Sequence, residues 1–238
     1  MSYFPRAARL LVVLALAGSA LAVPPAAVAA DQSRPVTQVV RPEALAVAAM
    51  QKRLRQNKRL PKRASITFIK NWKNPHASRL TFRAWAKAGP KGKKKWVPIE
   101  QATWRAGSGL GGKGGRDECR RNTGWLPNGS YSFVQRDRRK GPMINGRVFE
   151  LSPKVCRNGT QRQLLFIHSE QSSNNTQCRN RKGDDVCRWE LPQFNDYRSN
   201  GCIKMSPGDL KNLTRRFHRY FRADARYPTA VVKVRVRG

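Results

Sequence analysis

Ser199-Asn200-Gly201-Cys202-Ile203-Lys204-Met205-Ser206-Pro207-Gly208-Asp209 predicts a turn that leads directly into a helix. Ser206 is suited to cap the helix, Pro207 fits its first position, and Asp209 follows the cap by three residues. The residues that follow place an apolar stripe on one face and basic side chains on the other. The stripe consists of Leu210, Leu213, Phe217, Tyr220 and Phe221, and the basic face of Lys211, Arg215, Arg216 and Arg219. We expect this helix to pack on a sheet and to fix Cys202, which lies four residues before the cap.

Upstream of the turn, apolar and polar residues alternate with the period of two that is typical of strands. Ile66 and Phe68 precede the turn-like stretch 73–76, and Leu80 and Phe82 follow it, which predicts a hairpin. Residues 96–99 and 102–104 suggest a second strand pair, and further strands are expected at 130–134, 147–151, 163–168 and 229–236. Many short strands separated by Gly, Pro and Asn predict a mainly β domain, a sandwich or an open barrel, with one helix packed after the turn.

The segment Gly107–Gly115 contains six glycines and one lysine. Its likeness to a phosphate-binding loop is superficial, because Gly-Lys-Ser/Thr is missing and no parallel strand–helix unit follows. We expect a mobile loop here.

The N-terminus has the three parts of a secretory signal. Two arginines precede an apolar run that begins at Leu10, and small residues then offer a cleavage site near Ala29. A membrane anchor is the rival interpretation, but the run is shorter than the roughly 20 residues that a spanning helix needs, and Pro24-Pro25 breaks it. We therefore expect residues 1–30 to be removed on export, and the mature chain to be soluble, extracytoplasmic and without a membrane span.

The remaining chain divides by composition. Residues 31–63 are polar and basic, and Pro42 begins a stretch in which Leu45, Ala49 and Leu54 recur at helical spacing. This part is a linker or basic arm, either packed as a short helix or disordered. Residues 64–238 are long enough for one well-packed domain.

The formal charge is +34, and +32 remains once Arg6 and Arg9 are removed with the signal. Such a balance bears on partners and solubility rather than on fold. For an exported bacterial protein, wall polyanions are favoured over nucleic acid, and a solvated basic surface without a dedicated ligand is the third interpretation. The six tryptophans are scattered through the predicted strands, without the stacking platform of single-strand binders. No nucleic-acid partner is expected.

Five cysteines leave one thiol over when the others pair in disulfides. With Cys202 as the free thiol, the other four can pair in three ways, and we favour Cys119–Cys156 together with Cys178–Cys187. The second pair would close a short polar insertion that has no apolar core of its own. A zinc site is disfavoured because no two cysteines have C-x₂₋₄-C spacing and the three histidines are dispersed, so no metal and no cofactor are expected.

Cys202 and His168 together indicate nucleophilic chemistry. Cys202 lies beside a glycine on a turn of fixed position, and His168 ends an apolar run that reads as a buried strand. A thiol on such a turn, with an imidazole available elsewhere in the fold, is what nucleophilic acyl transfer requires.

Three segments carry a family resemblance. Gly124-Trp125-Leu126-Pro127-Asn128-Gly129-Ser130-Tyr131, Ile167-His168-Ser169 and Ser199–Met205 resemble, in order, the "TP-x-G-x-(Y/F)", "(I/V)H(G/S)" and "(S/T)HGC-(I/V)-(R/N)" segments of YkuD-type L,D-transpeptidases. The resemblance covers roughly residues 64–222. It implies a YkuD-like β domain that attacks tetrapeptide stems of peptidoglycan through a Cys202 thioester, releases D-alanine and forms 3→3 cross-links at the cell wall.

The resemblance also implies roles for individual residues. His168 would be the general base and, as imidazolium, would stabilise the Cys202 thiolate, with Ser169 orienting it through its hydroxyl or its backbone carbonyl. The N–H groups of Gly201 and Cys202 would form the oxyanion hole. Candidates for substrate binding are Ser199, Asn200, Lys204 and Arg198, the last two as partners of a substrate carboxylate.

The sequence departs from the family pattern at three points. Asn200 replaces the usual histidine, Lys204 replaces a frequent arginine, and 34 positions with the Cys178–Cys187 insertion separate His168 from Cys202. The insertion is expected to flank or cover the cleft. Hydrolysis of the same stems by an L,D-carboxypeptidase or endopeptidase remains an alternative, as do a non-enzymatic polycationic wall-binding protein and a secreted nucleic-acid-binding protein.

Overall fold

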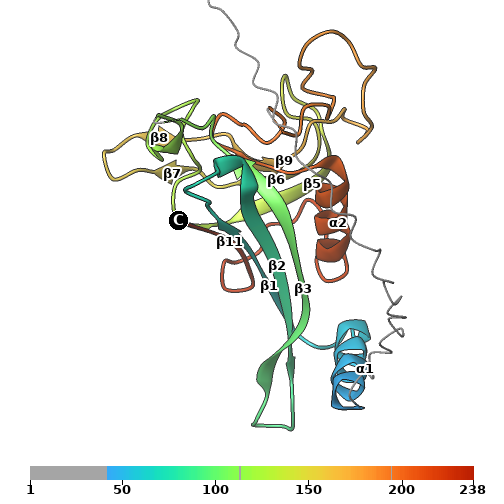
Figure 1. Ribbon diagram of the computed structural model, residues 1–238. Helices are drawn as coiled ribbons and strands as arrows, with labels where there is room; N and C mark the ends of the chain where they lie inside the picture. The colour runs from blue at the N-terminus through green and yellow to red at the C-terminus, as the bar shows by residue number, and fades with distance from the viewer. Residues whose placement is uncertain (1–41, 113, 194) are drawn as a thin grey trace, which may run out of the picture. The chain divides into compact units, whose positions relative to one another are not determined.

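The computed structural model describes residues 42–112, 114–193 and 195–238 (Figure 1). The expected signal segment, residues 1–30, and the first part of the basic arm, residues 31–41, lie outside this range. The rest of the arm is described and contains helix α1 (Pro42–Gln56), so the helical interpretation of this stretch is confirmed. Among the described helices, none has both the length and the apolar character needed to cross a bilayer.

The described part of the chain is mainly β. Nine strands form one mixed sheet in the spatial order β4-β11-β1-β2-β3-β10-β9-β6-β5, and two more form a small separate ribbon. In chain order the strands are β1 (Lys62–Ile69), β2 (Ser78–Ala88), β3 (Lys95–Ser108), β4 (Gly129–Tyr131), β5 (Phe133–Arg139), β6 (Gly146–Leu151), β7 (Lys154–Val155), β8 (Gln161–Arg162), β9 (Leu165–His168), β10 (Ile203–Lys204) and β11 (Val232–Arg237). Two 3₁₀ turns, η1 (Pro75–Ala77) and η2 (Gly114–Arg116), and helix α2 (Pro207–His218) complete the described elements.

The predicted hairpin is confirmed as β1 and β2, which pair antiparallel with Ile66 opposite Phe82. The predicted strand pair at 96–104 is wrong, because these residues form one long strand, β3, along β2. Pro98 is tolerated within β3 because the other edge of the strand is paired only near its end, at Gly107 and Ser108, and the register with β2 shifts beside it. The expected loop 107–115 is likewise corrected at its start, since Gly107 and Ser108 belong to β3.

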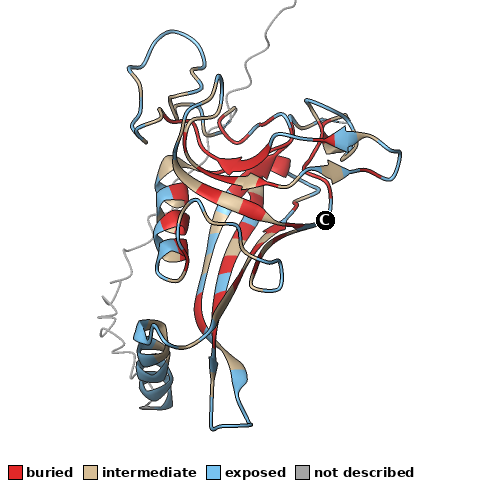
Figure 2. Cartoon of the chain, turned by 180° about the vertical axis from the view of Figure 1, so that it is seen from behind, coloured by how far each residue is buried: buried red, intermediate tan, exposed pale blue. Residues whose placement is uncertain are grey.

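One apolar core joins both halves of the sheet. Ile66 and Phe82 from β1 and β2 belong to the same buried cluster as Phe149 from β6 and Phe217 from α2. Figure 2 shows the buried residues gathered in the middle of the sheet and the exposed ones in α1, at the far end of the β2–β3 hairpin and in the loops. The ring of Phe217 lies 5.5 Å from Phe149, centre to centre, and joins the helix to the sheet. The prediction of a mainly β fold with a helix packed after the turn is confirmed.

Helix α2 is fixed at both ends. Ser206 caps its start and accepts a hydrogen bond from the Asp209 amide at 3.2 Å, as the sequence predicts. At its other end, the buried Glu100 of β3 accepts hydrogen bonds from Arg216 in the last turn, from Arg219 (2.8 Å) and from the hydroxyl of Tyr220 (2.6 Å). Because α2 is held in this way, the turn just before it has a defined position in the fold.

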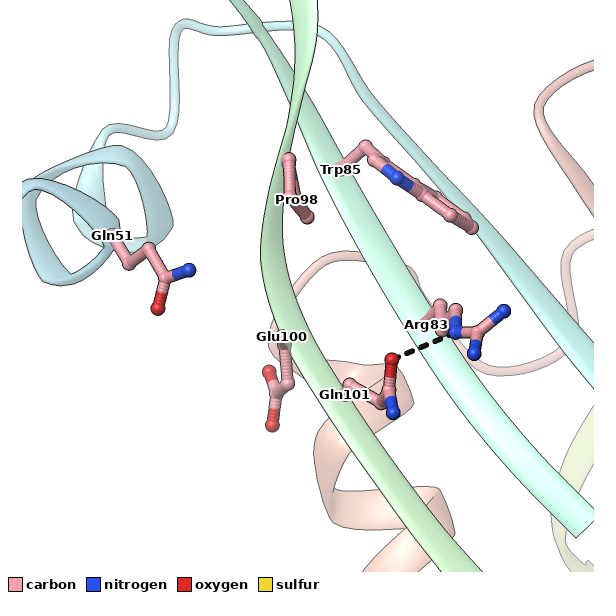
Figure 3. Close-up of a pocket in the computed structure, with 6 residues that line it drawn as sticks. All are labelled: Gln51, Arg83, Trp85, Pro98, Glu100 and Gln101. Atoms are coloured by element: carbon pink, nitrogen blue, oxygen red, sulfur yellow. Dashed lines mark hydrogen bonds between the residues drawn. The ribbon is translucent and has the colours of Figure 1, made fainter. Parts of the chain in front are cut away.

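Helix α1 contacts β2 and β3 and leaves a hollow of ≈ 250 Å³ beside them. Figure 3 shows its lining residues: Gln51 from α1, Arg83 and Trp85 from β2, and Pro98, Glu100 and Gln101 from β3. Arg83 donates a hydrogen bond of 2.8 Å to Gln101 across the strands. The lining of this hollow has no thiol and no imidazole, so it is not a candidate for nucleophilic chemistry.

Candidate active site

A cavity of ≈ 450 Å³ brings together the side chains that the sequence singles out. Cys202 and His168 line it, together with Ser169, Arg198, Ser199, Asn200 and Lys204. Strands β9 and β10 position them, because they pair in parallel with Ile203 beside Ile167 and Lys204 beside His168. Side chains alternate between the two faces of a sheet, so this register places Cys202 and His168 on the same face, the one that lines the cavity, while Ile167 and Ile203 point into the core.

Cys202 is a buried, protonated thiol. Its Sγ donates to the carbonyl of Leu164 at 3.5 Å. Burial raises the pKa of the Cys202 thiol to about 11, and a backbone hydrogen bond from Phe166 and the charges of Arg162 and Lys204 offset this only in part. The resting group is therefore the thiol and not the thiolate.

His168 is a neutral imidazole with a defined orientation. Its Nδ1 lies 3.3 Å from the carbonyl oxygen of Ser169, so Nδ1 carries the proton and Nε2 keeps its lone pair. Burial, with the nearby charge of Lys204, lowers the pKa of His168 to about 3. The expected thiolate–imidazolium pair is therefore not the resting state of this site. Of the two orienting roles expected for Ser169, its backbone carbonyl makes the contact and its buried hydroxyl has no partner among the described residues.

The protonation of His168 predicts an acid-sensitive fold. A folded-state pKa of about 3, against 6.5 for the free side chain, means that the folded protein resists protonation. The contribution is complete above pH 6.5 and is lost as pH falls toward 3, by roughly 1.4 kcal/mol per pH unit. Urea unfolding of the wild-type protein and of His168→Gln at pH 7, 5 and 4 measures it. The wild-type protein should lose more stability than the variant, and equal losses would contradict a buried neutral histidine.

Two of the four candidate substrate-binding residues have other partners. The Ser199 hydroxyl donates to the Cys202 carbonyl at 2.5 Å and braces the turn. The buried Lys204 ammonium forms an ion pair with Glu170, so its charge is not free for a substrate carboxylate. Arg198 and Asn200 are exposed on the cavity lining and are open to a ligand.

Sequence reasoning missed Arg162, whose buried guanidinium packs against the turn that carries Cys202. Its Nη1 donates to the backbone carbonyls of Glu118 and Trp125 (the latter at 3.2 Å), while Nη2 is buried and has no partner among the described residues. Gly201 has a φ of 105°, and a Cβ at this position would overlap Nη2. Because it has no Cβ, Gly201 allows the backbone of the turn to pack directly against the Arg162 guanidinium. No sequence signal distinguishes Arg162 among 48 basic residues.

The two N–H groups expected to form the oxyanion hole are available as donors. Within the described residues, neither the Gly201 nor the Cys202 amide has a hydrogen-bond acceptor. The first of the resembling segments also reaches the turn, since the carbonyl oxygen of Gly124 would lie 3.0 Å from a Cβ on Gly201. All three resembling segments therefore meet around Cys202.

Four exposed hydrophobic residues of the cavity lining were not predicted. They come from separate segments and are Leu110, Met143, Leu164 and Val186. Arg139, also missed, lines the same cavity and lies over the ring of Phe166 at 4.8 Å. Val186 and Asp184 come from the insertion, so the expectation that the insertion flanks the cleft agrees with its place in the lining.

Of the two expected disulfides, Cys178–Cys187 is present and closes the insertion. Cys119 and Cys156 are free thiols in this structure, which leaves three free cysteines where the sequence predicted one. The Cys156 thiol donates to the carbonyl of Glu118 at 3.4 Å, and burial, together with the neighbouring Cys119 thiol, raises the pKa of Cys156 to about 11. Their bridge stays a prediction.

Comparison with known proteins adds no assignment. No protein-family model matches the chain, and no curated protein matches it either.

Proposed function

We propose that the protein is a cysteine acyltransferase of bacterial peptidoglycan, of the L,D-transpeptidase type. The observation that carries the proposal is one cavity lined by a thiol on a braced turn and by an imidazole whose free Nε2 is set by the Ser169 carbonyl. Cys202 is the nucleophile and His168 the general base. The resemblance of the three segments that surround the turn supplies the substrate class.

The first half-reaction transfers the stem peptide to the enzyme. Cys202 Sγ leaves the Leu164 carbonyl and attacks the carbonyl between the diamino acid and the terminal D-alanine, while His168 Nε2 takes the thiol proton. The amides of Gly201 and Cys202 stabilise the tetrahedral oxyanion. When the C–N bond breaks, His168 returns the proton to the departing amine, so D-alanine leaves and a thioester remains.

The second half-reaction releases the peptide. An amine of a neighbouring stem attacks the thioester carbonyl, the C–S bond breaks, and the amine proton returns through His168 to the Cys202 sulfur. The product is a 3→3 cross-link with the enzyme regenerated. If water takes the place of the amine, the product is a tripeptide and the activity is that of an L,D-carboxypeptidase.

Incubation with purified disaccharide-tetrapeptide, followed by liquid chromatography and mass spectrometry, tests the proposal. Cross-linked dimers with free D-alanine are expected. Tripeptide alone would assign hydrolysis, and unchanged tetrapeptide with no enzyme adduct would contradict acyl transfer altogether.

A second candidate function, retention on wall polyanions, is favoured by one surface. The β2–β3 hairpin continues beyond the point where β1 begins, at the pair Lys62 and Ala86. Its tip is exposed and basic, with Lys87, Lys91, Lys93, Lys94 and Lys95, and the neighbouring α1 adds the exposed Lys52 and Arg53. We propose that this surface, the hairpin tip with α1, holds the exported enzyme at the wall by charge.

Charge reversal at the hairpin tip should weaken this retention. In Lys91→Glu/Lys93→Glu/Lys94→Glu, the basic tip becomes acidic while the cavity is unchanged, so release from a polyphosphate or wall column should occur at clearly lower salt. The matched control is Lys211→Glu/Arg215→Glu/Arg222→Glu, which changes the charge equally at exposed positions on or after α2. Equal salt dependence of the two variants would contradict a dedicated surface.

A further inference from the structure

Three carboxylates converge beside the catalytic cavity. Ligand oxygens of Glu170, Asp184 and Asp196 lie within 4.8 Å of one another. They come from three separate parts of the long segment between β9 and β10. Glu170 follows His168 by two residues, Asp184 belongs to the insertion closed by Cys178–Cys187, and Asp196 precedes Ser199 by three. In a chain with 14 acidic and 48 basic residues, such a gathering of carboxylates stands out.

The described groups leave this cluster incompletely satisfied. Lys204 binds one oxygen of Glu170, the backbone amide of Leu191 donates to one oxygen of Asp196 at 2.8 Å, and the side-chain amide of Asn195 donates to one oxygen of Asp184. The second oxygens, Glu170 Oε2 and Asp196 Oδ1, are buried and have no partner among the described residues. Glu170 is 6 % exposed and Asp196 0 %, so water does not solvate these oxygens as it would on the surface. Buried carboxylate oxygens that lack a donor require a bound cation or a shared proton.

We propose that Glu170, Asp184 and Asp196 bind one calcium ion. The Ca²⁺–oxygen distance is about 2.3–2.6 Å, so two ligand oxygens on opposite sides of the ion lie about 4.8 Å apart, which the cluster satisfies. The charge also fits: when all three carboxylates are ionised, they and the Lys204 ammonium leave two negative charges, which a single divalent cation neutralises.

The ligand types favour calcium over the other common metals. All three side chains offer oxygen, whereas zinc in proteins is bound mainly through histidine and cysteine. Magnesium demands a regular octahedron at about 2.0–2.1 Å, whereas calcium accepts irregular sites that water completes. The sequence argument against a zinc site concerned the spacing of cysteine and histidine. It does not apply to this site, which consists of carboxylates that follow no short spacing motif.

The ion would order the wall of the cavity. The described residues between His168 and Ile203 form no helix and no strand, and one disulfide joins them covalently. A calcium ion would tie the insertion to both the residue after β9 and the segment before the nucleophile turn. Binding does not depend on the proposed acyl transfer, because the ligands are neither the thiol nor the imidazole.

Terbium luminescence provides the direct test, since Tb³⁺ substitutes for Ca²⁺ at oxygen sites and is sensitised by nearby aromatic rings. Trp189 and Tyr197 lie in the same segment, with ring centres 4.9 Å apart. Titration of the full mature chain with TbCl₃ should give saturable luminescence that CaCl₂ displaces and MgCl₂ does not. Asp184→Asn should weaken binding about ten-fold or more, because affinity follows the number of charged ligands.

The choice of variants keeps the test decisive. Asp184 is exposed, so its replacement should leave the fold intact, which circular dichroism checks. The matched control is Asp224→Asn, an exposed carboxylate outside the cluster that pairs with Arg136. As a second measurement, CaCl₂ should raise the melting temperature of the wild-type protein relative to EDTA and leave that of Asp184→Asn nearly unchanged. Equal terbium binding by wild-type and Asp184→Asn proteins, or equal melting temperatures in CaCl₂ and EDTA, would overturn the proposal.

Discussion

Cys202→Ala should abolish the covalent adduct with a tetrapeptide or a carbapenem that the proposed acyl transfer requires. No other group in the cavity lining offers a thiol, so the variant has no route to the thioester. Turnover of tetrapeptide should fall by a factor on the order of 10⁴ or more, as is found when the nucleophile of a covalent mechanism is removed. Intact-mass spectrometry after incubation detects the adduct directly, and product chromatography measures the turnover.

The fold should survive this change, so that the loss can be assigned to chemistry. The replacement removes one buried sulfur atom and its 3.5 Å hydrogen bond to Leu164, at a cost of about 1–2 kcal/mol. Cys156→Ala is the matched control, because it removes a buried thiol that lies outside the cavity lining. It should retain adduct formation. An adduct that persists in Cys202→Ala would contradict the assignment of the nucleophile.

The parts of the fold that local chemistry determines were predictable. The capping serine and proline, with apolar residues at Leu210, Leu213 and Phe217, determine helix α2 from adjacent positions in the chain. The alternation through Ile66 and Phe68 likewise predicts a strand with one buried face. Strand β3 was misjudged because Pro98 usually interrupts a strand, and the sequence does not reveal that most of one edge of this strand lacks a partner.

The candidate site was predictable as a set of residues but not as an electrostatic environment. The order of His168, Gly201 and Cys202 along the chain allowed the cavity lining to be anticipated. The protonation states of His168 and Cys202 depend on burial, which arises only when β9, β10 and the segments around them pack together. For the same reason the partner of Lys204 was missed, since Glu170 is 34 positions away and only the parallel pairing of β9 and β10 brings the two together.

Gly201→Ala is the substitution with the largest expected effect on the architecture of the site. At φ 105° an alanine is strained, which costs on the order of 1–3 kcal/mol. Its Cβ would also overlap Nη2 of Arg162, and this guanidinium cannot turn aside without breaking its hydrogen bonds to Glu118 and Trp125. Either the turn or Arg162 must move. We expect a loss of about 10²-fold or more in the rate of thioester formation, because displacing the turn misplaces both the thiol and the oxyanion donors.

Two companion variants separate strain from collision. Gly159 has a φ of 80° with open space around it, so Gly159→Ala carries the backbone strain without a clash and should leave the thioester rate unchanged. In Gly201→Ala/Arg162→Ala the overlap is removed while the strain remains. If Arg162 is the obstacle, the free energy of unfolding lost in the double variant should be smaller than the sum of the two single losses, a coupling that urea denaturation measures. Strictly additive losses would show instead that Gly201 is required for its backbone angle alone, and that Arg162 supports the turn without limiting what can occupy it.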